Sequence, residues 1–397
     1  MPISWRVNKI GVSPTMKIAA EAKEMLARGE NVIDLSVGEP DFPTPLNVKE
    51  AAKRAIDQNE TRYTFNQGTI ELREAISNKL KNENGLDYSP HNIIVSTGAK
   101  QSIYNAIQSL VHDNDEVIFS SPYYVSYPEM VVLAHGRSVI IPTTEKSGFK
   151  ITPMQLQNVI TAKTKVLILC NPSNPTGTCY SRKELETIAE IIDQNNIYVI
   201  SDEIYEKIIY DNFEFTCFAS LSSKIKKRTV TINGFSKSYA MTGWRMGYAA
   251  GPEEIIKAMN KIQSHSTSNA SSISQAASLE ALTGPQDYVE MMRKEYELRR
   301  NFLHTALISI IDVSCYKPEG AFYLFPNISK YFHKSTPLFK IENSFDLAMY
   351  LLHEAKVATV PGSAFGSEGY LRLSYSTSME NLKEGVERIK DALSKLS

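Results

Sequence analysis

The sequence predicts an α/β fold in which a mainly parallel, seven-stranded sheet is flanked by helices and joined to a smaller α+β domain. Short apolar runs rich in β-branched residues recur through the middle of the chain. Helical patterns separate most of these runs, which is typical of a parallel sheet. At 397 residues the chain is also longer than one ordinary domain, so we expect two.

The elements of the larger domain follow in chain order. The seven expected strands are 93–96, 117–119, 138–141, 166–170, 197–201, 229–232 and 246–250. The expected helices between them are 101–111, 127–134, 153–159 and 182–195. Ligands of such a sheet bind beyond the carboxyl ends of the strands, so we expect the functional residues there.

The pattern changes after Ala250, where helices dominate. Two helices are expected at 253–264 and 274–300, then strands at 322–325 and 371–375 with helices at 345–354 and 379–396. The predicted division is an N-terminal arm with part of the small domain (1–45), a large domain (46–290) and a small C-terminal domain (291–397). The arm is rich in Pro and Gly, so we expect it to pack on other parts of the chain.

Composition excludes several classes of function. The 43 basic and 44 acidic residues leave a net charge of −1, so no field favours nucleic acid or an anionic membrane. No run of about 20 apolar residues predicts a membrane span, and the first residues lack the apolar core of a signal peptide. The four cysteines show no CxxC spacing, so neither disulfides nor a metal site is expected. We therefore expect a cytoplasmic protein.

Lys237 is the most informative residue. It lies in a loop of small residues, with Arg245 eight positions later and Asp202 after a predicted strand about 35 positions earlier. Pyridoxal phosphate (PLP) requires three such groups: an amine for a Schiff base, an arginine for the phosphate and a carboxylate for the pyridinium nitrogen. By itself, Asp202 is equally well interpreted as a helix N-cap.

Further residues extend this hypothesis. Tyr205 follows Asp202 by three positions, and Asn174 follows the strand before it, so both could donate to the cofactor's phenolate oxygen. Gly98-Ala99-Lys100 joins a strand to a helix, which is a place for an anion. Tyr124 could stack on the ring, although aromatic clusters more often simply pack.

Lys237 must be neutral to react, and burial beside the positive charge of Arg245 would lower its pKa. Arg372 alternates with Leu371 and Leu373 on a predicted strand, which suits a bidentate grip on a carboxylate. A surface salt bridge is the alternative for Arg372. Gly38 could let the backbone approach the same carboxylate, or could serve only as a turn.

Taken together, these segments resemble fold-type I PLP enzymes. The chain is most similar to class I aminotransferases, specifically the bacterial aspartate aminotransferases of the I-gamma (Ib) subgroup. The motifs are Ser-Val-Gly-Glu-Pro-Asp-Phe at 36–42, Ser-Pro-Tyr-Tyr-Val-Ser-Tyr-Pro-Glu-Met at 121–130, Asn-Pro-Thr-Gly at 174–177, Ser-Asp-Glu-Ile-Tyr-Glu at 201–206 and Ala-Met-Thr-Gly-Trp-Arg at 240–245.

The resemblance implies a role for each of these positions. It makes Lys237 the Schiff-base lysine and places Asp202, Tyr205 and Asn174 around the ring. It assigns the phosphate to Gly98, Ala99, Lys100 and Arg245, and the substrate's α-carboxylate to Arg372 and Gly38. It also implies a homodimer, in which Tyr63 reaches the phosphate of the neighbouring subunit.

The chain departs from the family at two positions. Tyr124 stands where many relatives have Trp, so stacking is kept while an indole N–H contact to substrate is lost. Gly234 stands where relatives have a phosphate-binding serine, and Ser236 is not an automatic replacement. A lysine matching Lys100 binds the second carboxylate in some relatives, with Ser13 and Thr15 as helpers here.

The function predicted from the sequence is ping-pong transfer of an amino group from L-aspartate to 2-oxoglutarate, with Lys237, Asp202 and Tyr205 as catalytic residues and Tyr124 and Asn174 near the substrate. The alternatives are an aromatic amino acid or prephenate aminotransferase and, less favoured, a PLP β-lyase. A ligand-sensing module joined to a DNA-binding domain would need a helix-turn-helix unit, for which we expect no room before residue 30.

Overall fold

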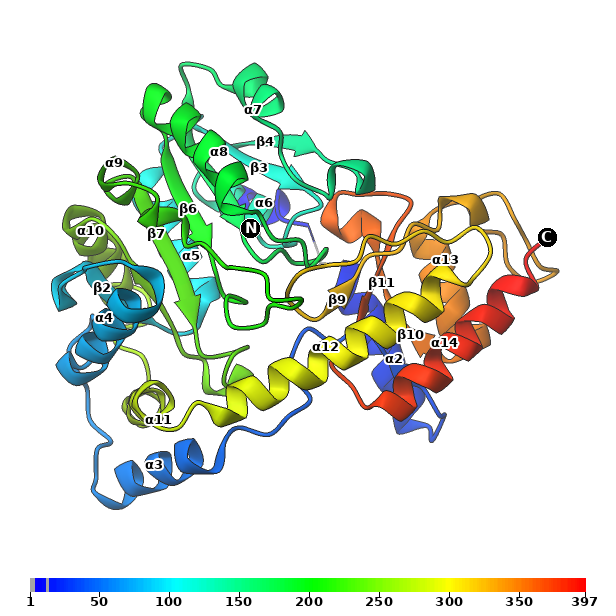
Figure 1. Cartoon of the computed structure of the whole chain (residues 1–397), viewed down its shortest axis with the longest axis horizontal. Helices are drawn as coiled ribbons and strands as arrows, with labels where there is room; N and C mark the ends of the chain where they lie inside the picture. Colours follow the sequence, from blue (N-terminus) through cyan, green and yellow to red (C-terminus); the bar gives the residue numbers. More distant parts are fainter. Residues whose placement is uncertain (1–3, 12–13) are drawn as a thin grey trace.

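The computed structural model describes residues 4–11 and 14–397 and is built around a seven-stranded sheet (Figure 1). The strand order is β2-β8-β7-β6-β5-β3-β4. Only β8 runs antiparallel to its neighbours, so the predicted mainly parallel sheet is confirmed. The strands are β2 Ile93–Ser96, β3 Glu116–Ser121, β4 Arg137–Pro142, β5 Thr164–Cys170, β6 Tyr198–Asp202, β7 Thr229–Gly234 and β8 Gly247–Ala250.

Helices cover both faces of this sheet, which is why its central strands are continuously apolar rather than alternating. Successive residues of β3 show this, because Val117 and Phe119 belong to one core cluster and Ile118 to the cluster on the opposite face. The helices are α3 Leu46–Asp57, α4 Ile70–Asn84, α5 Ala99–Leu110, α6 Tyr127–Leu133, α7 Pro153–Val159, α8 Arg182–Asn195, α9 Ser223–Lys226, α10 Glu253–Ser264 and α11 Ser272–Thr283.

A second, smaller set of strands joins the two ends of the chain. β1 (Ile33–Asp34) pairs in parallel with β10 (Val357–Ala358), and β11 (Val360–Pro361), β12 (Leu371–Ser374) and β9 (Tyr323–Leu324) form an antiparallel sheet. The helices here are α1 Trp5–Asn8, α2 Pro14–Ala27, α13 Ser344–Tyr350, which continues as a π-helical turn to Ala355, and α14 Met379–Ser394. Side chains of α2, β1 and α14 share one core. The domain boundaries at residues 45 and 290 stay a prediction.

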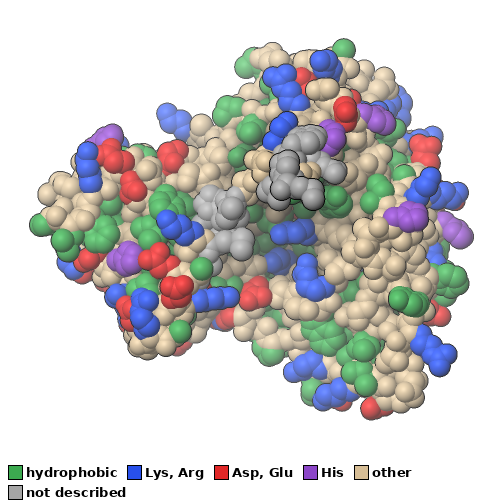
Figure 2. Space-filling view, turned by 180° about the vertical axis from the view of Figure 1, so that it is seen from behind, with side chains coloured by type: hydrophobic (Ala, Val, Ile, Leu, Met, Phe, Trp, Pro, Cys, Tyr) green, Lys and Arg blue, Asp and Glu red, His purple; other side chains and the backbone are tan. Residues whose placement is uncertain are grey.

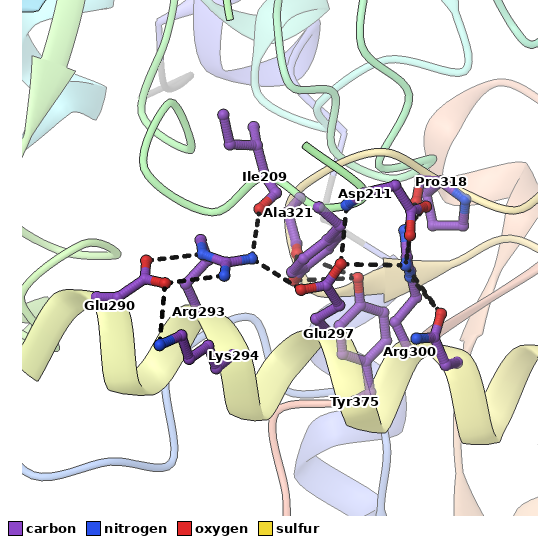
Figure 3. A network of polar contacts seen from close by, with 12 residues as sticks. Ile209, Asp211, Glu290, Arg293, Lys294, Glu297, Arg300, Pro318, Ala321 and Tyr375 are labelled. Carbon is purple, nitrogen blue, oxygen red and sulfur yellow. Dashed lines mark hydrogen bonds and ion pairs between the residues drawn. The ribbon is translucent and has the colours of Figure 1, made fainter. Parts of the chain in front are cut away.

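Helix α12 (Asp287–Ile308) runs from the large sheet to the smaller part of the molecule (Figure 1). Arg300 on this helix is fully buried and donates to both carboxylate oxygens of Asp211, at 2.8 and 2.9 Å, and to the carbonyl of Pro318. Arg293, two turns earlier, donates to the carbonyl of Ile209 and to Glu297 (Figure 3). The helix therefore fixes the segment after β6 against the segment before β9.

The prediction of one continuous helix over 274–300 is wrong. The structure has two helices, α11 and α12, with a break at Gly284-Pro285. The residue before a proline is disfavoured in the α region, and Gly284 accordingly has an extended backbone (φ −82°, ψ −174°). The Gly-Pro pair is a stop signal that outweighs the helical pattern on either side.

None of the helices in the described ranges combines the length and the hydropathy needed to cross a bilayer.

A buried ion pair holds the turn after β6 against α4. Lys79 on α4 pairs with Glu206, and Asn84 donates to the same carboxylate at 2.7 Å. All three side chains are buried. Burial works to raise the pKa of Glu206, but the charge and hydrogen bond of Lys79 outweigh it and hold that pKa below its usual value. Because Glu206 lies four residues after Asp202, the pair secures the end of β6.

Replacing Lys79 with methionine should strongly destabilise the protein. The buried Glu206 carboxylate would lose its counter-charge, which typically costs about 3–5 kcal/mol. Urea unfolding followed by circular dichroism measures the loss. The matched control is Lys53→Met, because Lys53 pairs with Glu50 on an exposed helix surface and should change little. Equal urea midpoints for the two variants would contradict the structural importance of the buried pair.

Candidate active site

Three of the predicted site residues lie at the carboxyl ends of neighbouring parallel strands. Asp202 is the last residue of β6, Asn174 follows β5 and Lys237 follows β7. In register, Cys170 of β5 is opposite Asp202, and Asp202 is opposite Ile232 of β7. The parallel arrangement therefore brings these three segments to one edge of the sheet.

The amine of Lys237 is set among aromatic rings and positive charges. It donates to the carbonyl of Gly38 and lies 5.8 Å from the ring centre of Tyr205 and 5.6 Å from that of Phe322. Burial and the charge of Arg372 lower its pKa to about 8, and Arg245 adds to the effect while Glu39 and Asp202 oppose it. A fraction of Lys237 is therefore neutral near pH 7, which makes it a nucleophile and a base.

The carboxylate of Asp202 is buried and only partly hydrogen-bonded. One oxygen accepts from the hydroxyl of Tyr127 at 2.7 Å, and the other accepts from the backbone N–H of Ile204 at 3.4 Å. Burial raises the pKa of Asp202 to about 6, although these two hydrogen bonds and Lys237 act in the opposite direction. A buried carboxylate in this state favours a positively charged hydrogen-bond donor as a partner.

Two tyrosines that the sequence analysis did not identify belong to this site. Tyr127, the first residue of α6, donates its hydroxyl proton to Asp202, which lies 75 positions later in the sequence. It belongs to the same aromatic run as Tyr124. Tyr323, on β9, has its hydroxyl 2.9 Å from that of Tyr205. No spacing in the sequence connects these pairs, because each forms only when separate elements pack together.

Arg372 is buried rather than on the surface, so the alternative of a surface salt bridge is excluded. Its Nη1 donates to Oδ1 of Asn174 at 3.1 Å and its Nη2 to the carbonyl of Ser36 at 2.6 Å. The guanidinium lies over the rings of Tyr323 and Phe365, at 4.5 and 5.1 Å from their centres.

The Nε of Arg372 is buried and has no hydrogen-bond partner among the described residues. A buried donor left unpaired is costly, so this group is ready for an oxygen acceptor. Gly38 lies beside it: a Cβ there would stand 3.3 Å from the hydroxyl of Tyr323 and 3.9 Å from Nη2 of Arg372. An arginine with an unpaired donor beside a glycine backbone is suited to contact with a carboxylate.

The start of α5 has features that suit an anion. Gly98 precedes the helix with φ of +83°, and no side chain caps the first N–H groups of α5. The guanidinium of Arg245 is so close that a Cβ on Gly98 would lie 2.5 Å from its Nη2. Helix N–H groups and an arginine together are typical of a phosphate site.

The remaining predicted residues differ in how far the structure places them. Tyr124 packs edge-on against Tyr127, with ring centres 5.4 Å apart, and the amine of Lys100 is 5.6 Å from the ring centre of Tyr124. Tyr63 is 91% exposed. Figure 2 shows Lys and Arg side chains gathered in the hollowed centre of one face of the molecule. Ser13 and the side chain of Thr15 lie outside the described residues.

The departure at Gly234 has a steric explanation. A Cβ there would lie 2.9 Å from the carbonyl oxygen of Met246 and 2.9 Å from the Cα of Gly247. Both contacts are with backbone, so a serine at this position would require the adjacent strand β8 to move.

Comparison with known proteins gives a consistent result. Residues 30–389 match the family model of class I and II aminotransferases. The chain is 47% identical over its full length to an aspartate aminotransferase of Bacillus subtilis, with all of that protein covered, and 48% identical to a probable aspartate/prephenate aminotransferase of Rickettsia typhi, with 99% of each chain covered.

Solved structures agree with this result. The aspartate aminotransferase of Rhizobium meliloti superposes with a TM-score of 0.96 at 45% identity, over the whole of both chains. The Thermus thermophilus aspartate aminotransferase with maleate gives a TM-score of 0.93 at 40% identity, covering 99% of this chain and all of that one. This chain therefore belongs to the class I and II aminotransferases.

Proposed function

We propose that this chain is a PLP-dependent aminotransferase that moves the amino group of L-aspartate to 2-oxoglutarate by a ping-pong mechanism. The observation that carries the proposal is the position of Lys237. Its amine is partly neutral near pH 7, because its pKa is lowered to about 8, and it is close enough to Asp202, Arg245 and Arg372 for the charges of all three to act on it. An anionic cofactor bound covalently to an amine requires this combination of groups.

The polar groups of the site fit PLP. The N-terminus of α5 and Arg245 would hold the phosphate, Asp202 would pair with the protonated ring nitrogen, and Tyr205 and Asn174 would donate to the phenolate oxygen. Tyr124 would cover one face of the ring. When bound, PLP withdraws electrons from the substrate's Cα and makes its C–H bond acidic.

Lys237 would act as nucleophile and as base. Its neutral amine would hold the cofactor through the aldehyde group and, when free, would take up the proton from the substrate's Cα. Such general base catalysis typically contributes about 10²–10⁴-fold to the rate. The carbonyl of Gly38, a residue that lies beside Arg372, accepts a hydrogen bond from this amine and holds it there.

Arg372 would bind the α-carboxylate of every substrate beside Gly38, using the N–H groups that Asn174 and Ser36 leave free. Lys100 would bind the second carboxylate of aspartate or 2-oxoglutarate. The Thermus thermophilus aspartate aminotransferase, 40% identical to this chain, was solved with maleate, which is a dicarboxylate. The name of the Bacillus subtilis relative also supports aspartate as the amino donor.

Prephenate is a second candidate acceptor. The relative from Rickettsia typhi, at 48% identity, is named a probable aspartate/prephenate aminotransferase. Prephenate carries two carboxylates as well as a ring, so it would use Arg372 and Lys100 in the same way. Measuring turnover with prephenate as acceptor, and with glutamate or aspartate as donor, distinguishes prephenate from 2-oxoglutarate as the preferred acceptor.

We also propose a homodimer in the cytoplasm. Tyr63 and Phe65 are 91% and 72% exposed, which is unusual for neighbouring aromatic residues of a monomer. Arg245 is also exposed, so the phosphate site is open to a residue from a second copy, and Tyr63 of the partner subunit is our candidate. All four cysteines are free, as in a reducing compartment.

Reduction of the PLP-loaded protein with borohydride should fix the cofactor's mass on the peptide that carries Lys237. The loaded protein should then convert aspartate only when a 2-oxo acid is supplied. Mass spectrometry and a coupled assay measure the two outcomes. Labelling of another lysine would refute the site, and release of pyruvate and ammonia from one substrate would favour the β-lyase alternative.

Lys237 of the PLP-free protein should react with amine reagents at a rate that rises with pH and is half-maximal near pH 8. The reason is that only the neutral amine reacts, and the pKa of Lys237 is lowered to about 8. Reductive methylation followed by peptide mass spectrometry measures the profile. A synthetic peptide of residues 230–245 is the control, with an inflection near the usual pKa of 10.5. The same inflection in the folded protein would contradict the lowered pKa.

Arg372→Ala should reduce kcat/KM for all amino and 2-oxo acids by about 10²-fold or more, because a buried charge that meets a carboxylate is removed. Lys100→Ala should harm aspartate and 2-oxoglutarate selectively and leave substrates with one carboxylate less affected. Steady-state kinetics with aspartate, alanine and phenylalanine separates the two effects. Equal losses in the Lys100 variant would remove the case for aspartate.

A further inference from the structure

Tyr323 contacts both ends of the proposed site. Its hydroxyl is 2.9 Å from the hydroxyl of Tyr205, at the end where the cofactor ring would lie. Its ring centre is 4.5 Å from the guanidinium of Arg372, at the end where the carboxylate would lie. We propose that Tyr323 is a positioning residue that orients the hydroxyl of Tyr205 toward the cofactor's phenolate oxygen and supports Arg372 through its ring. This inference rests on the proposed function.

The hydroxyl pair has a direction that follows from counting protons. Each tyrosine hydroxyl has one proton to donate. If Tyr205 donates its proton to the phenolate oxygen, it can only accept in its contact with Tyr323. Tyr323 must then donate, and the two hydroxyls form a chain ending on the phenolate. A hydrogen bond received by Tyr205 strengthens the one that it donates, so Tyr323 stabilises the anion without touching it.

The burial of the pair makes this direction important. Tyr323 is fully buried and Tyr205 is 3% exposed, so water does not compete readily for the contact. Burial raises the pKa of both phenols, which keeps both protonated and able to donate. No other described residue accepts from or donates to the Tyr323 hydroxyl, so its proton is available to Tyr205.

The ring of Tyr323 acts on Arg372 in a different way. The guanidinium lies over the rings of both Tyr323 and Phe365, which restrict the orientation of its plane. Each of its two terminal nitrogens donates one N–H, to Asn174 and to Ser36, which leaves Nε and the second N–H of each terminal nitrogen for the ligand. Loss of the ring would free the guanidinium to rotate, whereas loss of the hydroxyl alone would not.

Gly38 supports the same arrangement. A Cβ at this position would lie 3.3 Å from the Tyr323 hydroxyl, closer than most side-chain contacts allow. A side chain would therefore press on the hydroxyl pair and crowd the guanidinium of Arg372, whose Nη2 would be 3.9 Å away. The glycine keeps both features intact.

The test separates the hydroxyl from the ring with Tyr323→Phe and Tyr323→Leu. In the PLP-loaded protein, Tyr323→Phe should raise the spectral pKa of the bound cofactor by about 0.5–1 pH unit, because the phenolate loses support. The dissociation constant for maleate, measured by absorbance, should change less than about twofold. Tyr323→Leu should weaken maleate binding by about tenfold, because the cation–π contact is lost.

The matched control is Tyr375→Phe. Tyr375 is also fully buried in the same core, and its hydroxyl contacts that of Tyr210 at 3.4 Å and the carbonyl of Ala321 at 3.1 Å. Removing this hydroxyl should have a comparable effect on the thermal midpoint but should leave the spectral pKa and maleate binding unchanged. If Tyr375→Phe moves the spectral pKa as far as Tyr323→Phe, the effect is general loosening of the core and the inference is overturned.

A double variant tests whether Tyr323 acts through Tyr205. Once Tyr205→Phe has removed the intermediate hydroxyl, adding Tyr323→Phe should shift the spectral pKa no further. Additive shifts, or an unchanged spectral pKa in Tyr323→Phe alone, would overturn the inference while the proposed function stands. A wild-type chain that takes up no PLP would instead overturn the proposed function, and the inference with it.

Discussion

The withdrawal of the Lys237 amine from water is the constraint on which the rest of the site depends. A lysine at the protein surface stays charged, and a charged amine neither attacks an aldehyde nor removes a proton. Burial together with the positive charges of Arg372 and Arg245 brings its pKa to about 8. The fold must therefore place a lysine beside two arginines in a partly dry site, which would be unfavourable without carboxylates nearby and an anionic ligand to bind.

Burial also disfavours the charged form of Asp202, but for a carboxylate this raises the pKa instead of lowering it. Its pKa is raised to about 6 because the carboxylate is buried, with the Tyr127 hydroxyl and one backbone N–H as its partners. A cationic ring nitrogen would restore the balance of charge. Lys237 and Asp202 are both costly to keep charged in this site. A single ligand with an anionic phosphate and a protonated ring would therefore compensate the charges around both residues.

The end of the site that contains Arg372 depends on segments far apart in the chain. Arg372 comes from β12, and its two held nitrogens meet Ser36 near the N-terminus and Asn174 at the end of β5. Helix α12 joins two other segments near the site, because Arg293 and Arg300 bond to the segment after β6 and Arg300 also bonds to the segment before β9 (Figure 3). The ion pair of Lys79 and Glu206 secures the segment that carries Asp202 and Tyr205.

The sequence by itself determined the sheet and the residues at its carboxyl edge. Alternation of apolar runs and helical patterns indicated seven strands, and residues that follow parallel strands must meet at one edge, so Asp202, Asn174 and Lys237 could be placed together. The sequence is a poorer guide where local signals compete or are weak. The helical pattern over 274–300 was interpreted as continuous although Gly284-Pro285 breaks it, and the helices α2, α3 and α4 were not predicted at all.

Only the tertiary structure decided what the site residues touch. The contacts of Tyr127 with Asp202, Tyr323 with Tyr205 and Arg372 with Ser36 join residues that are 75, 118 and 336 positions apart, and no local pattern records them. The physical reason is that periodicity in a sequence reports which face of an element is buried, whereas hydrogen-bond partners depend on how whole elements pack. The lowered pKa of Lys237 and the unpaired Nε of Arg372 are consequences of that packing.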